Sequence, residues 1–176
     1  MRKILYALLL VSLISVASGA SLFVSIGDIQ GSPDSTVQVP ITVEGAKDVG
    51  SVDITLKYDP SVLKAVSVET ADLGKNAIME SNLANPGQVN IALVDASGIN
   101  GEGEIAIISF SVLGETGTSS PMSLLKASVY DLSLVEQQTT ISNGVLTVAE
   151  AKGTGYAFIL ITLMAAVLAA MVIRKN

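Results

Sequence analysis

The sequence contains no cysteine, no histidine and no tryptophan, and aromatic residues make up only 4% of its 176 residues. These absences exclude disulfides, thiolate or imidazole zinc sites, and nucleophiles activated by histidine. A glycosidase pair of carboxylates is still allowed by the 16 Asp and Glu residues. Such a site also needs aromatic side chains that position a sugar, and residues 21–149 hold only four. We therefore expect that the protein is not an enzyme and that it uses no cofactor.

Positive charge is also scarce in the middle of the chain. All 16 acidic residues lie between Asp28 and Glu150, where only five lysines occur, so this interval carries a net charge of −11. Binding to nucleic acid needs clustered Lys and Arg that neutralise phosphates. We expect no nucleic-acid partner.

A metal site is equally unexpected. The segment 95–102, DASGINGE, offers oxygen ligands for calcium, but the EF-hand pattern fails at its fifth position, Ile99. We interpret this segment as a β-hairpin loop.

The first twenty residues have the pattern of an export signal. Arg2 and Lys3 precede an apolar run over residues 4–16, and small residues follow at 17–20. A retained membrane helix is the alternative, but thirteen residues span only about 20 Å as a helix, less than the hydrocarbon core of a bilayer. We predict a signal peptide over 1–20, cleaved before Ser21.

Near the other end, residues 156–173 form an uncharged run of 18 residues, about 27 Å long as a helix. Arg174 and Lys175 follow at once, and positive flanks stay in the cytoplasm. We predict a single transmembrane helix over 156–173, a cytoplasmic tail over 174–176, and a short linker over 150–155. The domain would then lie on the extracellular side of the cell membrane. A glycolipid-attachment signal or a cleaved sorting tail are the weaker alternatives.

Residues 21–149 alternate apolar and polar positions almost throughout, with turn residues at short intervals. This pattern is typical of half-buried antiparallel strands. About nine short strands are predicted, with a long loop over 71–87 and a tight turn at 142–144. Pro40 predicts an edge or a locally unpaired position. The fold class is all-β, a two-sheet sandwich or jelly roll. The expected strands cover residues 22–26, 36–44, 51–58, 63–69, 88–95, 104–112, 123–130, 134–140 and 145–148.

The same alternation predicts which side chains face outward. If Val89, Ile91 and Leu93 are buried, then Ala92 and Val94 are exposed. In the segment 104–112, if Ala106, Ile108 and Phe110 are buried, then Ile105 and Ile107 are exposed. Together these would form an apolar patch of Ala92, Val94, Ile105 and Ile107 with a polar rim of Asp53, Thr55 and Lys57. An apolar centre with a polar border is typical of protein interfaces. The alternative is that a loop or strand covers these residues.

Several motifs resemble those of cohesin domains. The segment 50–68, GSVDITLKYDPSVLKAVSV, has the aromatic-Asp-Pro turn between two strands that is similar to the cohesin signature. The remaining features follow in the family's order, and the resemblance covers about residues 22–148. They are VQVPITVEG (37–45), NPG (85–87), VNIALVDASG (89–98), EIAIISFSV (104–112), and LVEQ (134–137) before an Asn-Gly turn and VLTV.

The resemblance implies a nine-stranded jelly roll that binds a dockerin module through the outer face of one sheet. It implies no catalysis and no cofactor, with calcium on the dockerin side. It places partner contacts at Ser51, Asp53, Ala92, Asp95, Gly98, Leu134 and Glu136, beside the outward Thr55, Val94, Ile105 and Ile107 of the pleat argument. Ser51 and Ala92 are smaller than the residues that many cohesins present there. Tyr58, Asp59 and Pro60 are expected to be structural.

Sequence thus predicts a membrane-anchored cohesin-like module that captures dockerin-bearing extracellular proteins, with polysaccharide-degrading enzymes as one class. Two alternatives stay open at this point. One is a carbohydrate-binding module at the cell surface, and the other is a structural protein of the surface layer or of adhesion.

Overall fold

The computed structural model describes residues 21–150. The predicted signal peptide, membrane helix and tail, and all but the first residue of the predicted linker, lie outside the described residues. Within 21–150, no helix is long and apolar enough to cross a membrane.

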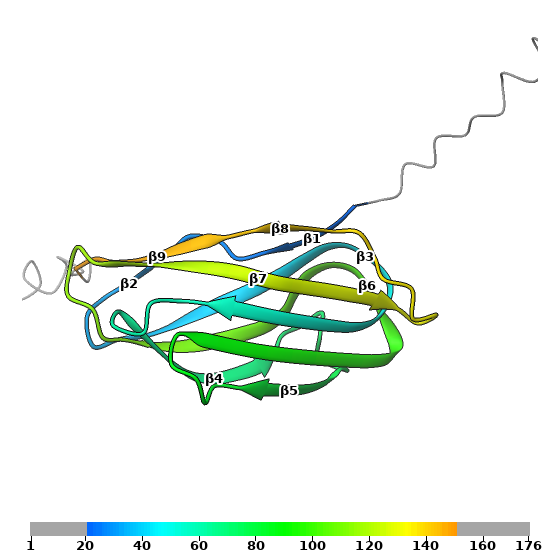
Figure 1. The fold of residues 1–176 in the computed structure, drawn as a ribbon, viewed down its shortest axis with the longest axis horizontal. Helices are drawn as coiled ribbons and strands as arrows, with labels where there is room; N and C mark the ends of the chain where they lie inside the picture. Colours follow the sequence, from blue (N-terminus) through cyan, green and yellow to red (C-terminus); the bar gives the residue numbers. More distant parts are fainter. Residues whose placement is uncertain (1–20, 151–176) are drawn as a thin grey trace, which may run out of the picture.

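Nine β-strands form the described part of the chain, which confirms the all-β prediction (Figure 1). The strands are β1 (Leu22–Ser25), β2 (Ile29–Gly31), β3 (Thr36–Lys57), β4 (Leu63–Thr70), β5 (Ile78–Asn82), β6 (Gln88–Val112), β7 (Ser119–Asp131), β8 (Thr139–Ser142) and β9 (Gly144–Val148).

Two strands are far longer than predicted. β3 has 22 residues and β6 has 25, and each joins two segments that the sequence suggested were separate strands. The segment 95–102 is part of β6 and not the expected hairpin loop. The chain bends there without reversing, because Gly98, Gly101 and Gly103 adopt positive φ angles of 80°, 105° and 148° that other residues rarely take. Each long strand therefore crosses from one layer of the sandwich to the other.

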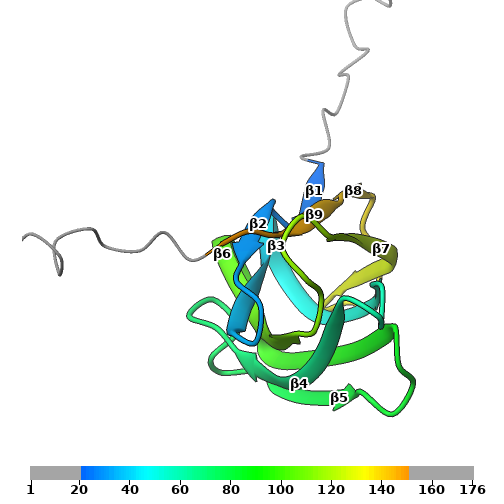
Figure 2. The same ribbon diagram turned by 90° about the vertical axis from the view of Figure 1, so that its left-hand side faces the viewer.

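Pairing divides the strands into two layers. The β4 layer runs β4, β6 (101–112), β3 (36–46), β1 and β8. The β5 layer runs β5, β6 (88–99), β3 (49–57), β7, β9 and β2. Seen along the long axis, β4 and β5 lie on the side opposite β1 and β8 (Figure 2). The predicted turn at 142–144 is therefore a crossing between layers, since β8 pairs with β1 whereas β9 pairs with β7 and β2.

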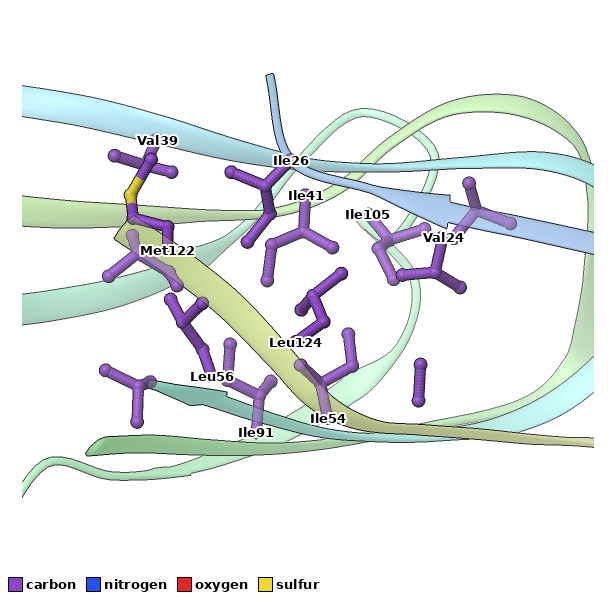
Figure 3. Packing of buried hydrophobic residues seen from close by; sticks show 14 of the residues in the cluster. Val24, Ile26, Val39, Ile41, Ile54, Leu56, Ile91, Ile105, Met122 and Leu124 are labelled. Carbon is purple, nitrogen blue, oxygen red and sulfur yellow. The ribbon is translucent and has the colours of Figure 1, made fainter. Parts of the chain in front are cut away.

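The core fills the space between the layers. Figure 3 shows Val24, Ile41 and Ile105 facing Ile54 and Leu124. The predicted inward residues of the segments 51–58, 88–95 and 104–112 are all buried, which confirms the alternation there. Pro40 pairs with β6 alone, because the pairing of β1 begins at Thr42 and that of β7 at Val49.

The aromatic-Asp-Pro turn is structural, as predicted. Tyr58 is buried and its ring meets that of Phe110 edge to face, with centroids 5.0 Å apart. The Asp59 carboxylate accepts hydrogen bonds from the Ser61 hydroxyl (2.6 Å) and backbone N–H (2.8 Å). These bonds, that of the hydroxyl first, hold the pKa of Asp59 below its ordinary value of 3.8.

Candidate protein-binding face

The outer surface of the β5 layer brings together five of the eleven predicted site residues, Ser51, Asp53, Thr55, Ala92 and Val94. We call the outward side chains of β5, β6 (88–94), β3 (51–57) and β7 (126–130) the docking face. Strand register arranges them in rows across the four strands, because directly paired residues point to the same side of a sheet. The rows, from β7 to β5, are Tyr130–Ser51–Val94–Ile78, Ser128–Asp53–Ala92–Glu80 and Lys126–Thr55–Asn90–Asn82.

The first row is the apolar end of the face. Val94 is 54% exposed and Ile78, its direct partner on β5, is 76% exposed. Large apolar side chains this open to water on neighbouring strands contribute little of their apolar surface to the stability of the free domain. They supply the apolar surface that a protein partner would bury.

The middle row places two carboxylates around a small residue. Asp53 and Glu80 are the direct partners of Ala92 on its two sides. Because alanine has only a methyl group, this part of the face is a shallow depression of about 500 Å³ that extends over the third row. It is lined by Asp53, Ile54, Thr55, Glu80, Ser81, Asn82, Asn90, Ile91, Ala92 and Lys126.

The third row is polar and held by hydrogen bonds. The Thr55 hydroxyl donates to the Asn90 carboxamide oxygen (3.1 Å), and the Gln88 amide donates to the same oxygen (3.0 Å). These bonds fix the orientation of Asn90 at the floor of the depression. Asp53 and Thr55 thus lie at the centre of the face, and not at a rim as the sequence suggested.

The structure corrects the predicted apolar patch. Ile105 is fully buried and Ile107 is half-buried, and both belong to the β4 layer and not to the docking face. Ile41 pairs with Ala106 but Thr42 pairs with Glu104, so Ile105 is an extra residue in the strand. Such a bulge breaks the alternation and places two consecutive side chains inside. Ile107 lies on the outer surface of the β4 layer, between Pro40 and Glu69.

Two further predicted contact residues lie outside the exposed surface of the docking face. Asp95 has the inward parity of Leu93 and is only 7% exposed, and its carboxylate accepts a hydrogen bond from the Ser97 N–H (2.8 Å). Gly98 is half-buried, and a β-carbon there would lie 3.1 Å from Leu132 Cδ1 and 3.2 Å from the Asp48 Cα. Asp95 therefore stabilises the local backbone of β6, and Gly98 allows the close approach of Asp48 and Leu132.

Leu134 and Glu136 extend the first row beyond β7. Glu136 forms an isolated antiparallel bridge with Tyr130, so it adds a fifth position to the row. Leu134, two residues earlier, is 81% exposed. The loop after β7 therefore joins the apolar end of the docking face.

The sequence reasoning missed the contribution of β5. Ile78, Glu80 and Asn82 lie in the segment predicted to be a loop, because β5 is an edge strand with four of five residues exposed and shows almost no apolar alternation. Tyr130, Ser128 and Lys126 were missed although their strand was predicted. The alternation of buried Ala127 and Val129 carries the signal that would have identified them, but it does not extend back to Leu124, because Leu125 is an extra residue in the strand.

The docking face carries Asp53 and Glu80 against Lys57 and Lys126, and Glu136 of the adjoining loop brings the net charge to −1. Among residues 21–150, no group of three or more acidic side chains is placed to hold a metal ion. The face therefore has an apolar end and a central depression flanked by the Asp53 and Glu80 carboxylates, which suit a polypeptide with basic groups.

The comparisons with known proteins agree with one another. The family model for the cohesin domain matches residues 22–148. Cellulosomal-scaffolding protein A of Acetivibrio thermocellus is 27% identical over 165 residues, which cover 82% of this chain and 9% of that protein. The chain thus spans under a tenth of the length of that relative.

Solved structures share the fold. A non-cellulosomal cohesin from the hyperthermophilic archaeon Archaeoglobus fulgidus matches with a TM-score of 0.70 at 24% identity, over 78% of this chain and 98% of that one. CaCohA2 of Clostridium acetobutylicum, in its complex with CaDoc0917, matches with a TM-score of 0.67 at 26% identity, over 73% and 100% of the two chains. A type I cohesin–dockerin complex of Clostridium thermocellum, formed by OlpA, matches with a TM-score of 0.67 at 16% identity, over 73% and 99%.

A single family model covers nearly all of the described residues, and cohesin structures share their fold. The chain therefore belongs to the cohesin family, whose domains are non-catalytic binding modules.

Proposed function

We propose that this cohesin domain captures dockerin-bearing proteins through the docking face and holds them at the outer surface of the cell. The observation that carries the proposal is the pair Val94 and Ile78, which are exposed side by side next to a depression over Ala92. Cohesins of the same fold have been solved in complexes with dockerins. Polysaccharide-degrading enzymes are one class of dockerin-bearing cargo.

Charge supports a protein partner with basic groups. The interval from Asp28 to Glu150 carries a net charge of −11, and the docking face together with Glu136 carries −1. Complementary charge raises association rates more than affinity, so we expect capture to slow as salt is added.

A glycan partner is less well supported by the described residues. Of their four aromatic side chains, Tyr58 and Phe110 are buried in the core. Phe23 lies in the β4 layer and Tyr130 in the β5 layer, so these two cannot form one flat platform for a sugar.

Anchoring at the membrane fits the placement of the docking face along the domain. The described chain leaves β9 beside the start of β7, where the Val148 N–H donates to the Thr118 carbonyl (2.9 Å). Leu134 follows the far end of β7, thirteen residues or about 40 Å away (Figure 1). A domain anchored through residues 156–173 would therefore present its apolar row away from the membrane. Anchoring raises the local concentration of captured protein at the surface.

The test of capture uses purified 21–150 and a panel of calcium-loaded dockerins, beginning with those of the genome that encodes this chain. Asp53→Ala combined with Ala92→Arg should abolish binding, because a long cation fills the depression. The matched control is Gln38→Ala with Ser109→Arg, the equivalent directly paired positions on the outer surface of the β4 layer. Binding that survives the first pair refutes the site. If the domain binds insoluble polysaccharide and no dockerin, or only itself, the proposed function is wrong.

The test of anchoring is membrane fractionation of the full chain in its own host. We expect the protein in the membrane fraction, with the domain digested by protease added to intact cells. Deletion of residues 156–173 should release it into the medium, and retention of the deleted form would contradict the anchor.

A further inference from the structure

One carboxylate closes the loop between β7 and β8. Asp131 Oδ1 accepts hydrogen bonds from the N–H groups of Ser133 (2.8 Å) and Val135 (3.0 Å), and Oδ2 accepts one from the Gln137 side-chain amide (3.0 Å). The main chain closes the same turn, since the Leu134 N–H donates to the Asp131 carbonyl (3.0 Å). A single side chain thus satisfies donors at three positions of the loop.

The residue at the tip of this loop has an unfavourable conformation. Leu134 has a φ of 63°, in the left-handed region that bulky residues rarely adopt. Its side chain is also 81% exposed. The left-handed backbone costs folding free energy, and the exposed side chain contributes almost nothing to offset it in the free domain. A conformation of this kind persists only where surrounding bonds determine it, and such residues cluster at binding sites.

The loop is also fixed relative to the docking face. The Leu132 N–H donates to the Asp48 carbonyl (2.9 Å), and the Gln137 N–H donates to the Val129 carbonyl (2.8 Å). Between these two attachments Glu136 pairs with Tyr130 of the first row. The loop therefore has little freedom to move away from the row.

We propose that Asp131 is a positioning residue for partner binding, because its carboxylate holds Leu134 and Glu136 in place beside the apolar row before a partner arrives. The inference rests on the proposed function and names a residue that acts through others. Because the loop is already ordered in the free domain, binding does not have to include the entropy cost of ordering it. The affinity is therefore higher than it would be for a mobile loop. Asp131 itself is half-buried, and both of its carboxylate oxygens are bonded within the loop.

The test compares Asp131→Ala, Asp131→Asn and the neighbouring control Ser133→Ala, whose backbone N–H keeps its bond. Affinity is measured for the dockerin that the panel above identifies, and hydrogen exchange of the Val135 amide is followed in the free domain. Asp131→Ala should weaken binding about tenfold, as expected when one or two ordered side chains are freed. It should also remove protection of the Val135 amide while core amides of β3 stay protected. Asp131→Asn keeps the Oδ1 acceptor, so it should restore most of the affinity and most of the protection of the Val135 amide. Ser133→Ala should match wild type in both measurements.

Equal affinity of Asp131→Ala and wild type would overturn the proposal, as would weakened binding with the Val135 amide still protected. If Asp131→Ala does not fold, Gln137→Leu is the second variant, because it removes the side-chain bonds to Asp131 Oδ2 (3.0 Å) and to the Val135 carbonyl (3.3 Å) but leaves both bonds to Oδ1. It should weaken binding in the same direction by a smaller factor, and an unchanged affinity would then overturn the proposal. A wild-type domain that binds no dockerin refutes the proposed function and this role together. A wild type that binds while the variants bind equally refutes this role alone.

Discussion

Replacement of Ile78 by alanine offers a quantitative test of the docking face. Ile78 is 76% exposed in the free domain, so its substitution should change the free energy of unfolding by less than about 0.5 kcal/mol. Burial of a whole isoleucine side chain contributes about 1.5–3 kcal/mol. Three quarters of that is still available to a complex, which gives about 1–2 kcal/mol. The dissociation constant should therefore rise about 5- to 30-fold. Alanine keeps the β-carbon, so these are upper values.

The assay is calorimetric titration with the captured dockerin, with thermal unfolding measured in parallel. Val66→Ala is the matched control, because Val66 is 54% exposed on β4, in the other layer. A change of less than twofold for Ile78→Ala would show that the partner does not cover the apolar end. An equal loss for Val66→Ala would show that the effect is not specific to the docking face.

Three further predictions concern stability. Ile105→Ala should destabilise the domain by about 2–5 kcal/mol in urea unfolding, whereas Val94→Ala should be nearly neutral, and the opposite order would contradict the corrected placement of Ile105. Gly74→Ala should destabilise the domain, because the new β-carbon would lie 2.3 Å from a backbone carbonyl oxygen. In the control Gly27→Ala the new β-carbon meets nothing within 4 Å, so this variant should be neutral or slightly stabilising. Equal melting temperatures of the two variants would refute this prediction. Asp59→Asn tests the lowered pKa of Asp59: the wild-type advantage from the ionised carboxylate should be fully present above the unfolded value of 3.8 and disappear as pH falls through the lower folded pKa. A stability difference between wild type and Asp59→Asn that stays constant from pH 6 to pH 2 would exclude the carboxylate as its source.

Family membership confirms that the chain is not an enzyme. The absence of histidine and cysteine had already excluded most catalytic schemes. The ordered motifs from 37 to 148 were enough to recognise the cohesin domain, because they record the buried face of each strand and the turn at Asp59.

Local alternation by itself determined the strand character of the chain and the outward direction of Asp53, Ala92 and Val94. Side chains alternate between the two faces of a strand with a period of two residues. This pattern is visible in the sequence of one strand without knowledge of the strands it pairs with. Only the tertiary structure decided which outward residues share a surface. Ile105 turned inward because a bulge in β6 shifts the parity by one residue, and Ile107 went to the opposite layer because β6 crosses between layers. Ile78 joined the face because β5 is an edge strand whose register is set by pairing with β6, a long-range contact that no local pattern encodes.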